Sequence, residues 1–173
     1  MRRPAASLYP DWPQYAVRIR DAVKDLSADD LALRAGPDHG AIWALAAHLA
    51  GSRVYWLCGV FGETGADRTP FPTPLTGEGW EDDEAHPRSG AELAWALDSS
   101  WEVVRDCLER WSADDLDLTA SRTRADGSIQ EFSRASVLNR LCSHDAFHAG
   151  EISQLLGLHD LGSIDLWVRE PPL

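Results

Sequence analysis

The sequence predicts an all-α protein folded as a four-helix bundle. Its 173 residues suit one domain, residues 1–173, with a substantial core. Apolar residues recur at three- and four-residue steps in four stretches, each long enough for a helix of about 15 to 24 residues. No convincing sheet accompanies them. Packing the four apolar faces together is therefore the simplest way to bury them.

The first two helices are expected over residues 12–26 and 41–61. Asp11, followed by Trp12 and Pro13, is typical of a helix start, with an N-cap carboxylate and a proline in the first turn. The second stretch follows a glycine-containing loop and is apolar on nearly every side. A helix of that composition is buried on most of its surface.

A long connection, residues 63–88, separates the second expected helix from the third. It contains four prolines and the acidic run Glu81–Glu84. A stretch of this length without regular structure is either functional or mobile, and it could cross the bundle and cover one end. The acidic run taken alone is interpreted as solvated surface.

The third helix is expected to begin with a capping box, formed by Ser89 and Glu92, and to end near residue 111. Residues 119–132 then alternate polar side chains around an Asp-Gly dipeptide. That pattern predicts a short hairpin or tight turn.

The pentapeptide Ser-Ala-Asp-Asp-Leu occurs twice, at residues 27–31 and 112–116. Each copy follows an expected helix and precedes a helix that carries histidine. The serine and the aspartate three positions later resemble a capping box. Two interpretations stay open: a weak two-fold internal repeat, or chance recurrence of a common capping pattern.

Charge and composition exclude several classes of partner. The net charge is −12, from 28 acidic and 16 basic side chains, which repels nucleic-acid phosphates. No apolar run approaches the roughly 20 residues of a membrane span, and the N-terminus lacks the apolar segment of a secretory signal. We therefore expect a cytoplasmic protein without nucleic-acid or membrane partners. Three scattered cysteines indicate reduced thiols.

The fourth helix, expected over 133–156 and ending at Gly157, carries His144 and His148. The two side chains project about 40° apart, and Glu151 falls about 20° to the other side of His144. Both histidines occupy positions where the pattern calls for apolar residues. Each unpaired buried imidazole would cost about 1–3 kcal/mol, and a shared metal ion would satisfy both. For the pair alone, ordinary core or surface histidines are the alternative.

A third histidine, His48, lies in the apolar second helix. Alone, it would be interpreted as a core residue. In a four-helix bundle, however, the inward faces of the second and fourth helices can be neighbours, which would bring His48 opposite His144 and His148. Three protein nitrogens leave an ion with an open position, as in catalytic zinc sites.

Three further residues have candidate roles near these histidines. Glu151 could be a fourth ligand, a general base, or a partner that holds an imidazole tautomer, and the last two roles are favoured. Asp145, about 100° from His144, is expected to cap or pair locally. Arg53, one turn beyond His48, is a candidate contact for an anionic group of the substrate.

Two segments resemble the DinB-like metalloenzyme superfamily: residues 43–56, and residues 144–153 with the downstream Asp165–Trp167. The resemblance implies an up-down-down-up bundle with long connections before and after the third helix, and frequently a homodimer. It also implies a divalent metal bound by His48, His144 and His148. Family members with known activity include transferases and isomerases that use mycothiol or bacillithiol, and metal-dependent hydrolases.

The expected function is therefore a metal-dependent enzyme that activates a low-molecular-weight thiol or water against a small-molecule substrate. The metal would be zinc, or else nickel, iron or manganese, with mycothiol or bacillithiol as possible co-substrates. The alternative is a non-catalytic dimeric helical protein whose metal site is structural or vacant.

Overall fold

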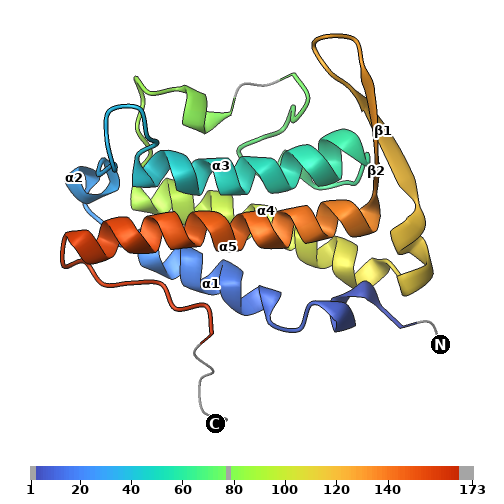
Figure 1. Ribbon diagram of the computed structural model, residues 1–173, viewed down its shortest axis with the longest axis horizontal. Helices are drawn as coiled ribbons and strands as arrows, with labels where there is room; N and C mark the ends of the chain where they lie inside the picture. Colours follow the sequence, from blue (N-terminus) through green and yellow to red (C-terminus); the bar gives the residue numbers. More distant parts are fainter. Residues whose placement is uncertain (1–2, 77–78, 168–173) are drawn as a thin grey trace.

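The computed structural model describes residues 3–76 and 79–167, which are mostly helical. Its long helices are α1 (Trp12–Val23), α3 (Ile42–Val54), α4 (Gly90–Arg110) and α5 (Arg134–Leu158), and they lie side by side (Figure 1). The predicted helical character is confirmed. A small two-stranded sheet is added at one end.

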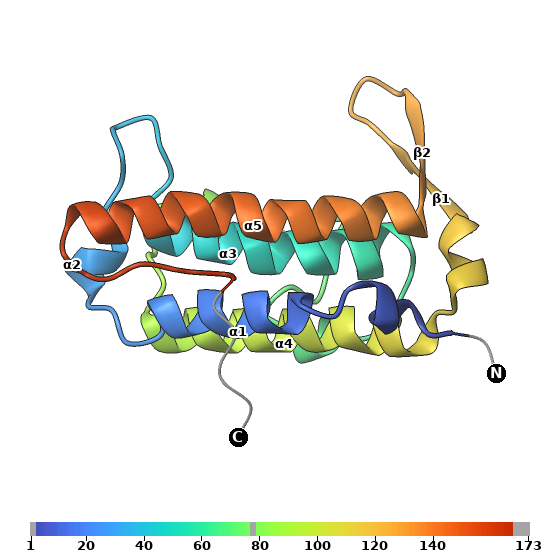
Figure 2. The same cartoon turned by 60° about the horizontal axis from the view of Figure 1, so that its bottom comes forward.

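The four long helices form two layers. Figure 2 shows α3 and α5 above α1 and α4. α1 packs mainly against α4 and α5, and α3 packs against the same two helices. The colours in Figure 1 show α1 and α5 running in one direction and α3 and α4 in the other. The contact between α3 and α5, on which the predicted histidine site depends, is therefore present.

Buried apolar side chains fill the space between the layers. Five of the largest fully buried ones are Trp12, Ile19, Trp43, Leu49 and Leu97, which come from α1, α3 and α4. α4, α5 and the long connection cover α3, and this coverage buries the apolar side chains that α3 carries on nearly all sides. No helix among residues 3–76 and 79–167 has the length and apolarity needed to span a membrane.

The ends of the helices follow the predicted caps with one exception. The reciprocal pair Ser89–Glu92 begins α4, and the Ser133 hydroxyl accepts from the backbone of Ser136 at the start of α5. At α1 the prediction was wrong, since Asp11 makes no side-chain cap hydrogen bond and the helix ends at Val23. The Asp11 backbone is helical, whereas an N-cap residue needs an extended conformation to reach the first turn.

The second predicted helix is two segments. α3 ends at Val54, and a π-helical segment, Tyr55–Val60, continues it. A π-helical turn contains more residues than an α-helical turn, so side chains after Val54 are rotated relative to a continuous α-helix. Tyr55 and Trp56 lie at this change.

The connection after the π-helical segment runs back along α3 (Figure 1). It contains two short 3-10 helices, Ala66–Arg68 and Trp80–Asp82, and the second packs against α3. The connection therefore covers the flank of α3, where the sequence suggested a cover over one end of the bundle.

Both copies of the repeated pentapeptide form capped turns. The first begins α2 (Ala28–Leu31), where the Asp30 amide donates to Ser27 Oγ at 3.1 Å. In the second, the Ser112 amide donates to Asp115 Oδ2 at 2.8 Å and starts the 3-10 helix Ala113–Asp117. The predicted capping role is confirmed, and local capping is sufficient to explain both copies.

The predicted hairpin is also present. β1 (Thr119–Thr123) pairs antiparallel with β2 (Ile129–Ser133), with Arg122 opposite Gln130. Gly127 in the turn has a φ of +80°, which side-chain-bearing residues rarely adopt. The hairpin leads directly into α5 and stands beside the end of α3.

Candidate metal centre

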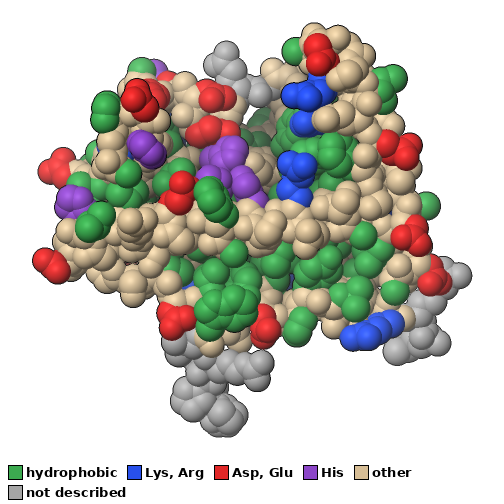
Figure 3. Space-filling model, in the orientation of Figure 1, with side chains coloured by type: hydrophobic (Ala, Val, Ile, Leu, Met, Phe, Trp, Pro, Cys, Tyr) green, Lys and Arg blue, Asp and Glu red, His purple; other side chains and the backbone are tan. Residues whose placement is uncertain are grey.

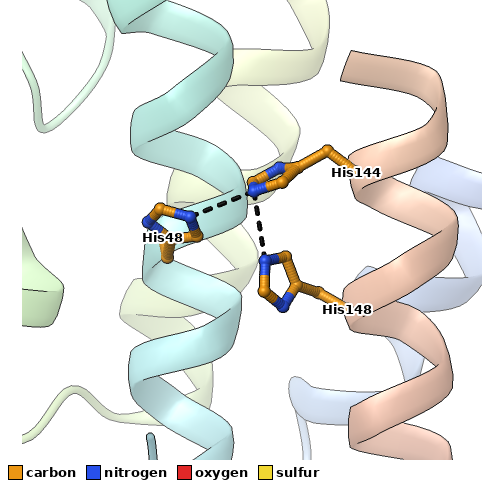
Figure 4. Close-up of side chains that lie close together, drawn as sticks. All are labelled: His48, His144 and His148. Atoms are coloured by element: carbon orange, nitrogen blue, oxygen red, sulfur yellow. Dashed lines mark hydrogen bonds between the residues drawn. The ribbon is translucent and has the colours of Figure 1, made fainter. Parts of the chain in front are cut away.

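Three histidines from two helices converge at the interface of α3 and α5 (Figure 4). His48 Nε2 lies 3.0 Å from His144 Nε2, and His148 Nε2 lies 3.1 Å from the same atom. The potential ligand atoms of the three residues all lie within 4.8 Å of one another. The structure thus brings together the histidines that the sequence predicted to meet.

Two carboxylates hold the other nitrogens of these rings. Glu151 Oε2 lies 2.5 Å from His148 Nδ1, and Glu81 Oε1 lies 3.3 Å from His48 Nδ1. A carboxylate accepts hydrogen bonds, so each Nδ1 donates and each Nε2 keeps its lone pair directed toward His144. Of the roles considered for Glu151, this contact corresponds to the partner that holds a tautomer.

The donor set fits a divalent cation. Lone pairs of His48 and His148 both face His144 Nε2, which carries at most one proton and can satisfy only one of them. A cation between the rings would accept lone pairs from all three. Imidazole nitrogens in this number are the ligands of catalytic zinc sites.

Glu81 is the site residue that the sequence interpretation missed. It belongs to the acidic run that was interpreted as solvated surface, and its side chain is only 25% exposed. The 3-10 helix Trp80–Asp82 packs against α3 and brings Glu81 to His48, 33 residues earlier. Because this contact is set by a loop, no helical periodicity could have revealed it. In the sequence, only the length of the connection indicated that it could have a functional role.

Burial sets the protonation states that metal ligation needs. It lowers the pKa of His144 to about 4, and the nearby charges of His148, His48, Arg53 and Arg140 act in the same direction. Burial also lowers the pKa of His148, against the opposing hydrogen bond of Glu151. For Glu81 burial raises the pKa, but the hydrogen bond to His48 is among the effects that outweigh it, so the net shift is downward. Near neutral pH the His144 and His148 imidazoles are therefore neutral and the Glu81 carboxylate is ionised.

Arg53 and Asp145 form an internal ion pair beneath the histidines. Both side chains are fully buried, with Arg53 Nη2 2.8 Å from Asp145 Oδ2. Arg53 also donates to the Leu97 carbonyl and to Ser100 Oγ, while Trp12 Nε1 donates to Asp145 at 2.7 Å. Asp145 therefore pairs across the bundle, and the prediction that it would cap or pair locally was wrong. The Arg53 guanidinium has its partners inside the protein, and the structure does not place it against the open side of the histidine cluster.

An open cavity adjoins the histidines. It has a volume of about 340 Å³ and lies between one face of α3 and the connection, with His48, Ser52, Tyr55, Phe71 and Glu81 among its lining residues. The His48 side chain is 41% exposed. Figure 3 shows the histidine side chains, in purple, at the edge of a hollow in the surface. A small molecule can therefore approach the converging nitrogens from this side.

The cysteines lie apart from this centre. Cys58, Cys107 and Cys142 are free thiols, as predicted. Burial raises their pKa values to about 11, 12 and 11, respectively. Thiols that remain protonated at neutral pH are poor nucleophiles and poor metal ligands.

Comparison with known proteins decides the family. A family model described as the DinB superfamily matches residues 16–152. The chain belongs to the DinB superfamily. No curated protein matches this DinB-superfamily chain. Its fold is similar to the crystal structure of a DinB-like protein from Bacillus cereus ATCC 10987, with a TM-score of 0.66 over 95% of this chain and 99% of that one. The two sequences are 17% identical, so this likeness concerns the fold alone.

Proposed function

We propose that the protein is a divalent-metal-dependent enzyme acting on a small molecule, with His48, His144 and His148 as the metal ligands. The reaction is transfer of a low-molecular-weight thiol to an electrophile, or hydrolysis by water. One observation carries the proposal: three imidazole Nε2 atoms converge beside an open cavity, and carboxylates hold the opposite nitrogens of two rings.

A divalent ion bound by three neutral nitrogens keeps a position for a further ligand and lowers the pKa of a thiol or water there. Zinc is the first candidate, and nickel, iron and manganese also accept imidazole ligands. Mycothiol and bacillithiol are the candidate thiols, in line with the family resemblance. The up-down-down-up bundle expected for the family belongs to the same proposal, and the helix directions in Figure 1 support it.

Glu81 is the candidate to receive a proton from the attacking thiol or water. Its Oε2 atom is buried and has no hydrogen-bond partner among the described residues, and its side chain lines the cavity. Its lowered pKa keeps the carboxylate ionised near neutral pH. Glu151 bonds His148 through its carboxylate, so we assign it the role of positioning that ring.

The metal assignment is tested by zinc content after reconstitution and removal of free metal. We expect one zinc per wild-type chain, and loss of stoichiometric zinc in His48→Ala and His144→Ala. His159→Ala, at the exposed position directly after α5, is the matched control and should keep its zinc. Unchanged zinc content in His48→Ala would overturn the assignment.

Catalysis is separated from a structural role by a second measurement. Zinc-loaded protein is screened with mycothiol, bacillithiol and a generic electrophile for loss of free thiol, and its melting temperature is compared with and without chelator. Turnover that disappears in His48→Ala supports the enzyme. A large chelator-induced drop in melting temperature, with no turnover and no exchangeable ligand position, would identify a structural metal instead.

A further inference from the structure

Two arginine side chains contact the same pair of aromatic rings, outside the histidine cluster. Trp56, from the π-helical segment, packs edge to face against Phe132 of β2, with ring centroids 4.8 Å apart. The guanidinium carbons of Arg122 and Arg140 lie 4.9 and 5.0 Å from the Trp56 ring. Each also lies 5.6 Å from the Phe132 ring centroid, and their distances to the Trp56 ring put the two carbons at most 9.9 Å apart. Strand β1 and helix α5 thus place two positive charges over one apolar platform.

Neither guanidinium has an acidic partner among residues 3–76 and 79–167. Arg122 donates to Gln130 Oε1 at 3.0 and 3.2 Å and to the Tyr55 hydroxyl at 3.2 Å, all uncharged groups. Arg140 is exposed, and its guanidinium contacts are the two rings. Three other arginines, Arg20, Arg68 and Arg134, each pair with a carboxylate.

Arg34 and Arg124 likewise have no carboxylate partner within the described ranges, so what distinguishes Arg122 and Arg140 is that both contact the same two aromatic rings. Two like charges held near one another repel, and their stacking on Trp56 and Phe132 keeps them in place. An anion bound between them would relieve the repulsion. Arg122 is also preorganised, because Gln130 fixes it while part of its five-donor fork remains available.

The arginines lie within reach of the histidine cluster. Arg140 is one turn before His144 on α5, a rise of about 6 Å along the axis. Tyr55, which contacts Arg122, lies about 10 Å along the helix from His48. Tyr55 lines both the cavity beside His48 and a shallow pocket of about 240 Å³ that includes Arg122. Figure 3 shows basic side chains, in blue, and hydrophobic ones, in green, across the hollow from the histidines.

We propose that Arg122 and Arg140 form a subsite for the carboxylate of a small molecule whose other end reaches the histidine cluster. The inference rests on the proposed function and adds a substrate class to it: anionic molecules that span about 6–10 Å between the reacting group and the carboxylate. The carboxylate belongs either to the thiol or to the electrophile, and the Tyr55 hydroxyl hydrogen can donate to it while its oxygen accepts from Arg122.

The test uses matched probes on zinc-loaded protein, read by isothermal titration calorimetry. Mercaptohexanoate and mercaptohexanol share a thiol and a chain of suitable length and differ in the carboxylate. If the carboxylate belongs to the thiol, wild type binds mercaptohexanoate about tenfold more tightly. If it belongs to the electrophile, hexanoate binds together with a thiol, so protein already saturated with β-mercaptoethanol should still bind hexanoate. In either case, added salt should weaken the carboxylate-dependent binding.

The variants are Arg122→Met, Arg140→Met and the double substitution, which remove charge but keep an apolar chain on the rings. Each should lose most of the carboxylate-dependent binding, while the lysine substitutions should keep part of it. Arg105→Met, on the exposed face of α4, removes the same charge far from the cavity and is the control. If Arg122→Met disturbs the hairpin, Arg140→Met gives an independent measurement, because Arg140 is exposed on a helix.

Equal binding of all carboxylate probes to wild type and to the double methionine variant would overturn the subsite. So would the absence of any carboxylate-dependent binding to zinc-loaded wild type. Zinc content measured on the same samples keeps this failure distinct from failure of the metal assignment. Hexanoate binding to metal-free protein provides the converse check, since the arginine subsite does not require the ion.

Discussion

At the scale of single residues, the centre depends on two carboxylates that fix the orientation of two imidazoles. Glu151 is three residues from His148 on one helix, whereas Glu81 reaches His48 from a loop. The first contact follows from helix geometry, since residues three apart are neighbours on the surface of a helix. The second depends on how the connection packs against α3.

Replacing Glu81 with glutamine should weaken zinc binding by about 10- to 100-fold, the usual effect of losing a carboxylate behind a ligating histidine. The amide oxygen can still accept from His48 Nδ1, but the negative charge that makes His48 a stronger metal ligand is lost. Competition with a chromophoric chelator measures the affinity. Glu84→Gln, an exposed position in the same acidic run, is the control. Equal affinities in the two variants would remove Glu81 from the site.

His144 should make the metal-free protein sensitive to acid. Burial lowers its pKa from the ordinary 6.5 to about 4, so the folded state disfavours the protonated ring that the unfolded chain readily forms. The stabilising contribution is complete above pH 6.5 and is lost as the pH falls from 6.5 toward 4. Melting temperatures of chelated protein across this range measure it. The slope should be smaller in His144→Phe, and an unchanged slope would contradict the assignment.

At the scale of elements, the buried pair Arg53–Asp145 connects the helices. Arg53 projects from α3, Asp145 from α5, and their hydrogen bonds reach α4 through Leu97 and α1 through Trp12. One network thus joins all four long helices directly beneath the histidines. Asp145 follows His144 in the chain, so this network also helps to fix the helix that carries two of the ligands.

Arg53→Met should lower the free energy of unfolding by about 3–5 kcal/mol, because it leaves the Asp145 carboxylate buried without its charge partner. The double variant Arg53→Met with Asp145→Leu should cost less than the single substitution, since no unpaired charge remains. Urea unfolding measures both values. A double variant less stable than Arg53→Met would contradict this account.

Gly90 marks a close approach between α1 and α4. A Cβ added there would lie 2.3 Å from the Lys24 carbonyl oxygen and 2.9 Å from that of Val23, both backbone atoms. Gly90→Ala should therefore cost about 1–3 kcal/mol through overpacking. At Gly150 in α5 nothing lies within 4 Å of the added carbon, so Gly150→Ala should stabilise the protein by about 0.5–1 kcal/mol. Thermal unfolding compares the two, and a shift of the same sign in both would contradict the prediction.

At the scale of the whole molecule, the family resemblance predicts a homodimer. The chain mass is 19.1 kDa, so light scattering coupled to size-exclusion chromatography should give twice that value. The measurement belongs at moderate salt, because a net charge of −12 per chain makes association of two copies dependent on ionic strength. A mass of one chain across micromolar concentrations would contradict the expectation.

The sequence by itself determined the helical fold, the main helix starts and the three histidines. These features depend on helical periodicity and capping, which involve residues only three or four positions apart in the chain. Examples are Ser89 with Glu92, Ser133 with Ser136, and His144 with His148. Helix periodicity also identified Glu151. The break into a π-helical segment at Tyr55 was not predicted, because its composition differs little from that of the preceding turns.

Only the tertiary structure decided the remaining parts of the centre. Glu81 meets His48 across 33 residues, Arg53 meets Asp145 across 92, and Arg122 and Arg140 meet on Trp56 from three separate elements. A sequence pattern specifies which face of a helix is apolar, but not which loop packs against it or which buried charge pairs with which. Those choices come from packing all the elements together, and they bury Arg53 inside the bundle while Arg122 and Arg140 lie against the rings of Trp56 and Phe132.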